Sequence, residues 1–206
     1  IMELAGKYLR DPKRISVDTE NTVTDNVTQE LVETTDELKY SVLTELLDKQ
    51  PSSVLIFTKT KYGAERLSKR LLREKFLACV LHGDLSQAKR ERAIREFKSQ
   101  KCIIMVATDI AARGLDISHI DTVINYDLPQ AAEDYIHRIG RTGRAGRNGV
   151  AISLLTKNDH QKWRDICKLL RTECGLPDAP REPRKPSAPG RPRAKRPFHR
   201  RPKRNK

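Results

Sequence analysis

The chain has 206 residues, a formal net charge of +14 and 33% charged residues, but only 5% aromatic residues. This length suits one domain with an appendage. Its apolar runs are too short to cross a bilayer, and its four cysteines form no CxxC pair, which excludes a membrane-spanning protein and argues against a disulfide scaffold or a cysteine-held metal. We therefore expect a cytoplasmic protein in a reducing compartment, with no metal ligands of its own.

Short apolar runs alternate with segments of helical periodicity, a pattern typical of a parallel sheet with crossover helices. The sequences VLIF and IIMVA, at 54–57 and 103–107, are apolar throughout, as strands covered on both faces are. The predicted strands are Val27–Glu33, Val54–Thr58, Ala78–His82, Ile103–Ala107, Thr122–Tyr126 and Val150–Leu155. The predicted fold class is therefore α/β, with a parallel sheet flanked by helices.

Helical spacing of apolar residues predicts the elements between these strands. The repeats are Leu38, Val42 and Leu46, then Ala64, Leu67 and Leu71, and last Trp163, Ile166, Leu169 and Leu170. Ser86 and Asp109 stand where helices begin and are interpreted as caps. Gly175 and Pro177 would end the final helix.

Residues 177–206 differ in composition from the rest of the chain. They hold twelve Lys or Arg residues, two acidic residues and eight of the eleven prolines. Such a segment has little to bury, so we expect a disordered tail with extended stretches. Its charge favours sequence-independent binding to RNA, while the alternatives are a solubilising or localising tail or a ligand for an acidic protein.

Four segments each contain a polar loop that follows a predicted strand, at the edge of a parallel sheet where binding sites usually lie. The segments are LIFTKTK (55–61), HGDLSQAKRERAIREF (82–97), VATDIAARGLDI (106–117) and INYDLP (124–129). A fifth, HRIGRTGR (137–144), carries an arginine cluster suited to a polyphosphate, because guanidinium binds phosphate through paired hydrogen bonds. Arg138, Arg141, Arg144 and Arg147 recur every three residues, so on a helix they would lie along roughly one side, and a solvated basic helix end is the alternative.

In this order and spacing the five segments resemble motifs IV, QxxR, V and VI of the DEAD-box RNA helicases. The histidine that opens motif VI, His137, favours this group over DEAH-type, RecQ-type and chromatin-remodelling relatives. The resemblance implies a C-terminal RecA-like helicase domain at 22–176, preceded at 1–21 by the end of a first RecA-like domain and a linker. GxxxxGK[ST] and DEAD segments are absent from the sequence. ATP and Mg²⁺ would therefore be bound mainly by an N-terminal RecA-like domain, and this chain alone would be inactive.

The resemblance also implies roles at the nucleotide. Arg144 corresponds to an arginine finger and Arg141 to a second contact of the γ-phosphate. Asp116 corresponds to an aspartate that binds the ribose hydroxyls; a helix cap is the alternative. His137 would link motif VI to the acidic motif of the other domain, and Arg113 would pair with a carboxylate to hold its loop.

For RNA, the resemblance implies contacts with the sugar–phosphate backbone. The implied RNA-binding residues are Thr60, Lys61, Gly83, Arg90 and Thr108. Hydroxyls and backbone amides at helix starts can hold phosphate without reading bases, and Gly83 would allow close approach. Gln87, the first residue of QxxR, would bridge motifs, and an exposed helix charge is the alternative for Arg90.

The leading hypothesis is thus one half of an ATP-dependent RNA helicase, with RNA and an N-terminal RecA-like domain as partners. A second is a non-catalytic RNA-binding or annealing module. A third is a docking domain for a protein partner.

Overall fold

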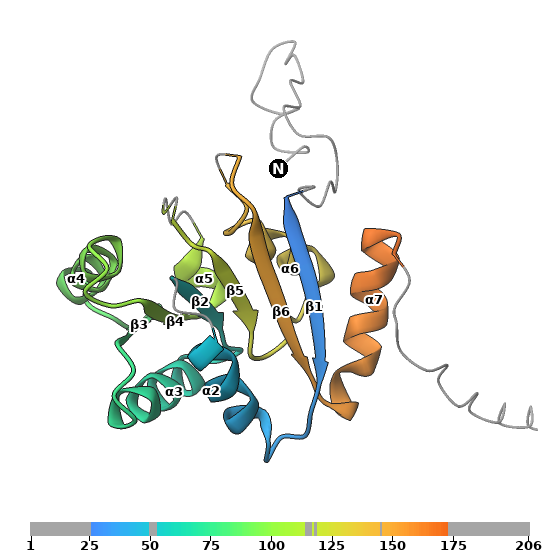
Figure 1. Cartoon of the computed structure of the whole chain (residues 1–206), viewed down its shortest axis with the longest axis horizontal. Coiled ribbons are helices and arrows are strands. Elements are labelled where there is room, and N and C mark those ends of the chain that lie inside the picture. Colours follow the sequence, from blue (N-terminus) through green and yellow to red (C-terminus); the bar gives the residue numbers. More distant parts are fainter. Residues whose placement is uncertain (1–25, 50–52, 114–116, 118, 145, 173–206) are drawn as a thin grey trace, which may run out of the picture. The chain divides into compact units, whose positions relative to one another are not determined.

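The computed structural model describes residues 26–49, 53–113, 117, 119–144 and 146–172. Four predictions lie outside the described residues: the linker at 1–21, the role of Asp116, the helix stop at Gly175 and Pro177, and the tail at 177–206. The described part of the chain forms a parallel sheet with helices on both faces, which confirms the predicted α/β class (Figure 1).

Six strands make up the sheet in the described residues, in the order β1-β6-β5-β2-β4-β3, and every neighbouring pair is parallel. They are β1 (Val27–Glu33), β2 (Val54–Phe57), β3 (Ala78–Leu81), β4 (Ile104–Ala107), β5 (Thr122–Asn125) and β6 (Gly149–Leu155). All six predicted strands are present, with bounds within one residue of the prediction. β2, β4 and β5 are buried along their whole length, as apolar strands between two helical layers must be.

Successive side chains of the central strands enter two different apolar clusters. Ile56 of β2 packs in the cluster that α2 (Lys39–Lys49) and α3 (Lys61–Arg73) complete. Phe57 packs in the cluster on the other face, with α4 (Gln87–Lys98) and α5 (Asp109–Ala112). This alternation of period two fixes which face each helix covers.

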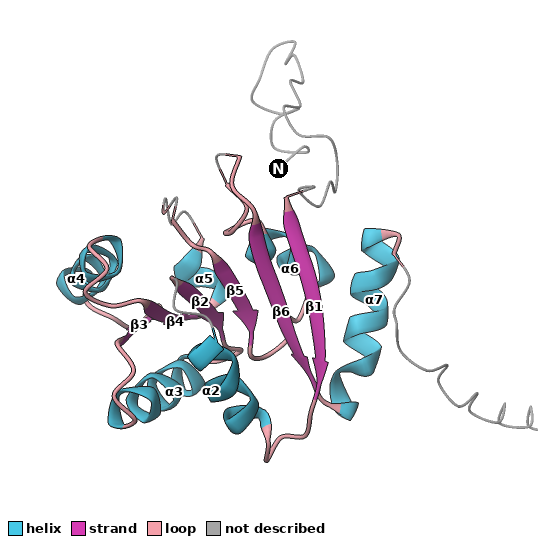
Figure 2. Cartoon of the chain, viewed as in Figure 1, coloured by secondary structure: helices cyan, strands magenta, loops and turns pink. Residues whose placement is uncertain are grey.

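The remaining helices are α6 (Ala132–Ile139), a 3₁₀ turn (Lys157–Asp159) and α7 (His160–Leu170). Figure 2 shows α6 on the same side of the sheet as α5. The rings of Tyr135 in α6 and Trp163 in α7 meet edge to face, with centroids 5.6 Å apart. Arg171 ends α7 in a left-handed conformation, with φ of 54°. None of the described helices has the length and apolarity that crossing a membrane requires.

The predicted caps are wrong in detail. Ser86 precedes α4, but its side chain makes no capping hydrogen bond. Asp109 is the first residue inside α5, and Thr108 stands at the cap position; the Asp109 carboxylate binds Arg138. A true cap stands before α3, where the Thr60 hydroxyl oxygen accepts from the Gly63 amide at 3.0 Å.

The segment HRIGRTGR is not one continuous helix, because α6 ends at Ile139. Arg141, Arg144 and Arg147 therefore lie in the loop that leads to β6, not along the helix side predicted from their spacing. Two glycines shape this loop. Gly143 has φ of +67°, and a Cβ at Gly149 would lie 2.2 Å from Thr142 Oγ1.

Replacement of Gly149 by alanine should destabilise the domain by about 1–3 kcal/mol, because the added methyl meets both the Thr142 side chain and the Gly143 backbone nitrogen. Urea unfolding followed by circular dichroism measures this change. Gly83→Ala is the matched control, since a Cβ there meets nothing within 4 Å. Equal stability of the two variants would contradict the tight packing of this loop.

Candidate functional site

The loops that carry the predicted motifs lie at the carboxyl edge of the sheet. Thr58–Lys61 follows β2, His82–Asp84 follows β3, Thr108 follows β4 and Asp127 follows β5. Because all strands are parallel, these loops share one edge, as predicted.

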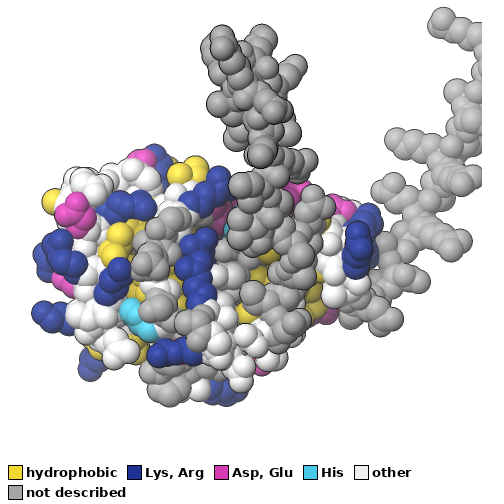
Figure 3. Space-filling model, turned by 90° about the horizontal axis from the view of Figure 1, so that it is seen from above, with side chains coloured by type: hydrophobic (Ala, Val, Ile, Leu, Met, Phe, Trp, Pro, Cys, Tyr) yellow, Lys and Arg dark blue, Asp and Glu magenta, His cyan; other side chains and the backbone are white. Residues whose placement is uncertain are grey.

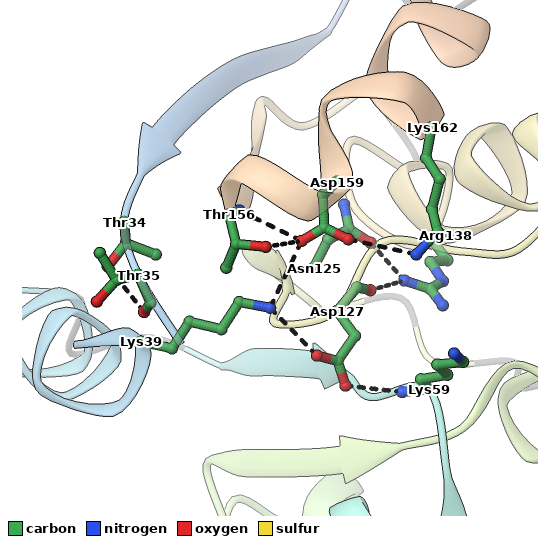
Figure 4. Close-up of polar contacts among 10 residues, drawn as sticks. All are labelled: Thr34, Thr35, Lys39, Lys59, Asn125, Asp127, Arg138, Thr156, Asp159 and Lys162. Carbon is green, nitrogen blue, oxygen red and sulfur yellow. Dashed lines mark hydrogen bonds and ion pairs between the residues drawn. The ribbon is translucent and has the colours of Figure 1, made fainter. Parts of the chain in front are cut away.

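A buried arginine joins two of these loops to α6. Arg138 is the largest fully buried side chain of the described residues, with 1% exposed. Its Nε and Nη2 bind the two carboxylate oxygens of Asp109 at 2.5 and 2.8 Å. Its Nη1 donates to Asn125 Oδ1 at 3.1 Å and to the Asp127 carbonyl at 2.6 Å (Figure 4). Its guanidinium carbon lies 4.8 Å from the centroid of the Phe57 ring. A buried charge requires such complete pairing.

A second buried cation stands on the other side of the Asp127 loop. The Lys39 ammonium lies 3.3 Å from Asp127 Oδ1 and 3.9 Å from Asp159 Oδ2, and it faces the Tyr126 ring at 5.4 Å (Figure 4). Asp127 Oδ2 accepts from the Lys59 amide at 3.0 Å. The carboxylate of Asp127 therefore ties the loop after β2 to the loop after β5 and to the start of α2.

Asp159 anchors this network beyond β6. Burial by itself would raise the pKa of its carboxyl group, but hydrogen bonds from Thr156 and the charges of Lys39 and Lys162 outweigh burial and lower it. The Thr156 hydroxyl donates to Asp159 Oδ2 at 2.8 Å, and Lys162 lies 3.3 Å from Oδ1. Asp159 is thus an ionised group whose charge is balanced by contacts with Thr156, Lys39 and Lys162.

The predicted RNA-binding residues gather at the same edge but differ in their surroundings. The Thr60 hydroxyl caps α3, whereas the Thr108 side chain precedes α5 without a capping bond. Gly83 is exposed in the loop between β3 and α4. The Lys61 ammonium contacts the Asp84 carboxylate in that same loop.

The two QxxR residues have partners within the domain. Arg90 is half-buried, and its Nη2 donates to the Ala111 carbonyl at 2.7 Å, so it joins α4 to α5. It is therefore not a simple exposed helix charge. The Gln87 amide donates to Glu91 one turn later in α4 at 2.8 Å, so it bridges no second motif through this bond.

Basic side chains also gather over α4, at the left of Figure 3. Arg92 and Arg95 are exposed there, but Glu96 and Glu91 pair with them one turn away on the same helix. Such pairs are ordinary on a solvated helix surface. This patch therefore offers less unpaired charge than its number of cations suggests.

The loop after α6 carries Arg141 and Arg144 of motif VI. The Thr142 hydroxyl is within hydrogen-bond distance of the carbonyls of Ile120 and Asp121, at 2.7 and 2.8 Å, where β5 is about to begin. Arg141 and Arg144 flank this buried threonine. The backbone of this loop is therefore held at the end of β5 opposite the predicted RNA contacts, while the Arg141 side chain lines a hollow with Phe57 and Asp109.

Backbone carbonyls hold the two guanidinium groups. Arg141 Nε donates to the His137 carbonyl at 3.2 Å, and Arg144 Nε donates to the Gly140 carbonyl at 2.8 Å. Burial and the charge of Arg144 lower the pKa of Arg141 from its ordinary value. Two like charges close enough to influence each other make a favourable environment for a polyanion.

Motifs V and VI meet at a small hollow between α5 and α6. Its lining includes Arg113, His137, Arg138 and Arg141. Arg113 donates to Asp134 at 2.6 Å, which is the carboxylate pairing expected of it. His137 is exposed, and its expected partner belongs to another domain. In the described part of the chain, no group of three or more potential metal ligands occurs.

Residues 38–146 match the family described as Helicase conserved C-terminal domain. The chain belongs to this family. Its sheet and helices also match solved DEAD-box proteins, which confirms the RecA-like fold. A DEAD-box protein of Methanococcus jannaschii is 40% identical, with a TM-score of 0.70 over 84% of this chain and 46% of that chain. Escherichia coli SrmB, solved with a regulator of ribonuclease activity, is 36% identical, with a TM-score of 0.65 over 69% of this chain and 85% of that chain.

The curated relatives of this helicase domain are longer proteins. DEAD-box ATP-dependent RNA helicase CshA of Bacillus cereus is 39% identical over 181 residues, which cover 87% of this chain and 34% of that protein. CshA of Limosilactobacillus reuteri is 40% identical over 83% of this chain and 35% of that protein. The chain thus spans about a third of the length of the curated relatives it matches.

Sequence reasoning missed the buried polar network of this helicase domain. Arg138 was grouped with the phosphate-facing arginines by its spacing, although its neighbours Ile136 and Ile139 were a signal of burial. The ion pairs of Lys39 with Asp127 and Asp159 carried no local signal, because these partners are distant in the sequence.

Removal of the Arg138 charge should strongly destabilise the helicase domain. We expect Arg138→Met to cost about 3–5 kcal/mol of unfolding free energy, because it leaves the Asp109 carboxylate without its bidentate partner. Arg138→Met combined with Asp109→Leu should recover much of this loss, as urea unfolding would measure. Additive losses in the double variant would contradict direct coupling of the two groups.

Proposed function

We propose that this domain is the C-terminal half of the catalytic unit of an ATP-dependent RNA helicase. The observation that carries the proposal is the arginine pair Arg141 and Arg144, held by backbone carbonyls beside the motif V and VI hollow. Two neighbouring positive charges would favour a polyphosphate presented by another domain. The similarity to DEAD-box RNA helicases over most of the chain supports the same function.

Phosphoryl transfer needs positive charge where the γ-phosphate departs, and a second domain can supply that charge in trans. In this proposal Arg144 is the arginine finger and Arg141 is a further γ-phosphate contact. Asp116 would bind the ribose hydroxyls, because a carboxylate accepts hydrogen bonds from two adjacent hydroxyls. Mg²⁺, which offsets phosphate charge when bound, would be held mainly by the N-terminal RecA-like domain.

RNA would lie along the carboxyl edge of the sheet. Thr60, Gly83 and Thr108 offer hydroxyl and amide donors to phosphates, with Lys61 and Arg90 beside them. Gly83 supports this arrangement, because neither a positive φ nor lack of space in the fold requires glycine at this position. Contacts of this kind hold the backbone of one strand and are largely independent of sequence.

The two ligands would act together. Saccharomyces cerevisiae Dbp5, 36% identical with a TM-score of 0.74 over 82% of this chain and 46% of that chain, was solved bound to RNA and ADP BeF₃. We infer that ATP and RNA each bridge the two RecA-like domains here, so that each ligand favours the closed state that the other binds. Closure around one strand would separate short duplexes locally.

RNA-stimulated ATP hydrolysis by the complete gene product that carries this chain tests the proposal. We expect Arg144→Ala and Arg141→Ala each to lower the stimulated rate by ~10³-fold or more, because each removes charge from the transition state. Arg147→Ala, an exposed arginine in the same loop, is the matched control and should retain activity.

The opposite result has a clear meaning. Hydrolysis that is insensitive to both substitutions would overturn the role of the two arginines, and RNA binding without any hydrolysis would replace the assignment with a non-catalytic RNA-binding module.

A further inference from the structure

One ion pair and one hydrogen bond from α3 hold the loop His82–Asp84. Lys61 Nζ contacts the Asp84 carboxylate, and Glu65 Oε1 lies 2.9 Å from His82 Nε2. Lys61 and Glu65 are four residues apart on one helix, so they project from the same face. Their partners stand on either side of Gly83, whose backbone is thereby fixed relative to the start of α3.

The contact of His82 with Glu65 is more buried than the ion pair of Lys61 with Asp84, so the two contribute differently to stability. His82 is 6% exposed, and its contact with Glu65 lowers the pKa of that carboxyl group, together with the contact from Lys69. The side chains of Lys61 and Asp84 are 41% and 60% exposed. Exposed ion pairs add little to stability, so a structural role alone explains the inner pair better than the outer one.

Gly83 offers a backbone donor that the fold leaves accessible. In the described part of the chain, its amide takes no part in a hydrogen bond, while the next turn is closed by Leu85 N and the His82 carbonyl at 3.2 Å. No neighbour lies within 4 Å of where a Cβ would stand. A phosphate could therefore approach the Gly83 amide directly.

The ammonium of Lys61 is already engaged. Its hydrogen bond with Asp84, followed by the charge of that carboxylate, raises the pKa of Lys61. It also faces the exposed ring of Tyr62, with 5.2 Å between Nζ and the ring centroid. A lysine held in this way is poorly placed to be an independent phosphate ligand.

We propose that Lys61 and Asp84 form a clamp that positions the Gly83 amide for a phosphate of the bound strand, and that Lys61 is a positioning residue rather than a phosphate ligand. This inference rests on the proposed RNA-binding function and changes the role of one residue within it.

The two roles of Lys61 predict opposite results for Asp84. If Lys61 binds phosphate directly, Asp84 competes with the RNA, and Asp84→Ala strengthens binding. If the pair is a clamp, Asp84→Ala and Lys61→Met each weaken binding by about two- to tenfold, because the misplaced Gly83 amide loses part of its hydrogen bond to the charged phosphate. The double variant should then bind RNA as weakly as each single variant, because either substitution alone already breaks the contact between Lys61 and Asp84.

The experiment measures the affinity of the full 206-residue chain for a single-stranded oligouridine at several salt concentrations. A clamp leaves the slope of log K against log salt unchanged in Lys61→Met, whereas loss of a direct phosphate contact reduces its magnitude by about 0.7 for a single strand. Thermal unfolding of each variant should stay close to that of the parent chain, since the pair is exposed.

Gly83→Val is the control that separates the two proposals. If Gly83→Val weakens binding but Asp84→Ala and Lys61→Met do not, or Asp84→Ala tightens binding, the clamp is wrong and the RNA site stands. If Gly83→Val leaves binding unchanged, RNA does not use this loop, and both the RNA site and the clamp are overturned.

Discussion

The architecture of this domain depends on the burial of the Arg138 guanidinium. A fully desolvated charge is tolerated only when every donor has a partner, and Arg138 finds those partners in α5, β5 and the loop after β5. The same bonds fix the start of α5, where Thr108 and Asp109 stand, relative to α6. Three residues after Arg138 comes Arg141. The geometry of motifs V and VI is therefore set by one electrostatic requirement of the interior.

This arrangement places the proposed RNA and nucleotide sites around one sheet. Thr108 stands at the carboxyl edge, and Arg141 and Arg144 stand in a loop whose Thr142 bonds to the carbonyls just before β5, with the Arg141 side chain in the hollow beside Asp109. Asp109 and Arg138 form a direct chain of contacts between the two regions. A displacement of α5 by a bound strand would thus act on α6 through the ion pair of Asp109 with Arg138.

Much of the fold was predictable from the sequence. Strands covered on both faces must be apolar throughout, so VLIF and IIMVA could be recognised directly. The parallel order then placed the motif loops at one edge. Motif order and spacing likewise identified the family that the comparisons establish.

Side-chain pairing was not predictable in the same way. Asp109 has the sequence position of a helix cap, but its carboxylate binds an arginine 29 residues away. Lys39 and Asp127 are 88 residues apart, and no local pattern relates them. The three-residue spacing of Arg138, Arg141 and Arg144 would place them on one side of a helix. In the structure α6 ends at Ile139, so Arg141 and Arg144 lie beyond it. Such contacts arise only once the elements are packed, which is why residue roles were less predictable than strands.

Amide chemical-shift mapping of the whole chain with a single-stranded oligouridine tests the central claim most directly, because it locates the bound strand without assuming which residues matter. The account predicts that the amides of Thr60, Gly83 and Thr108 shift together at the carboxyl edge, while those of Arg92 and Arg95 on the basic surface of α4 do not. Shifts concentrated on α4, or confined to residues 177–206, would contradict it.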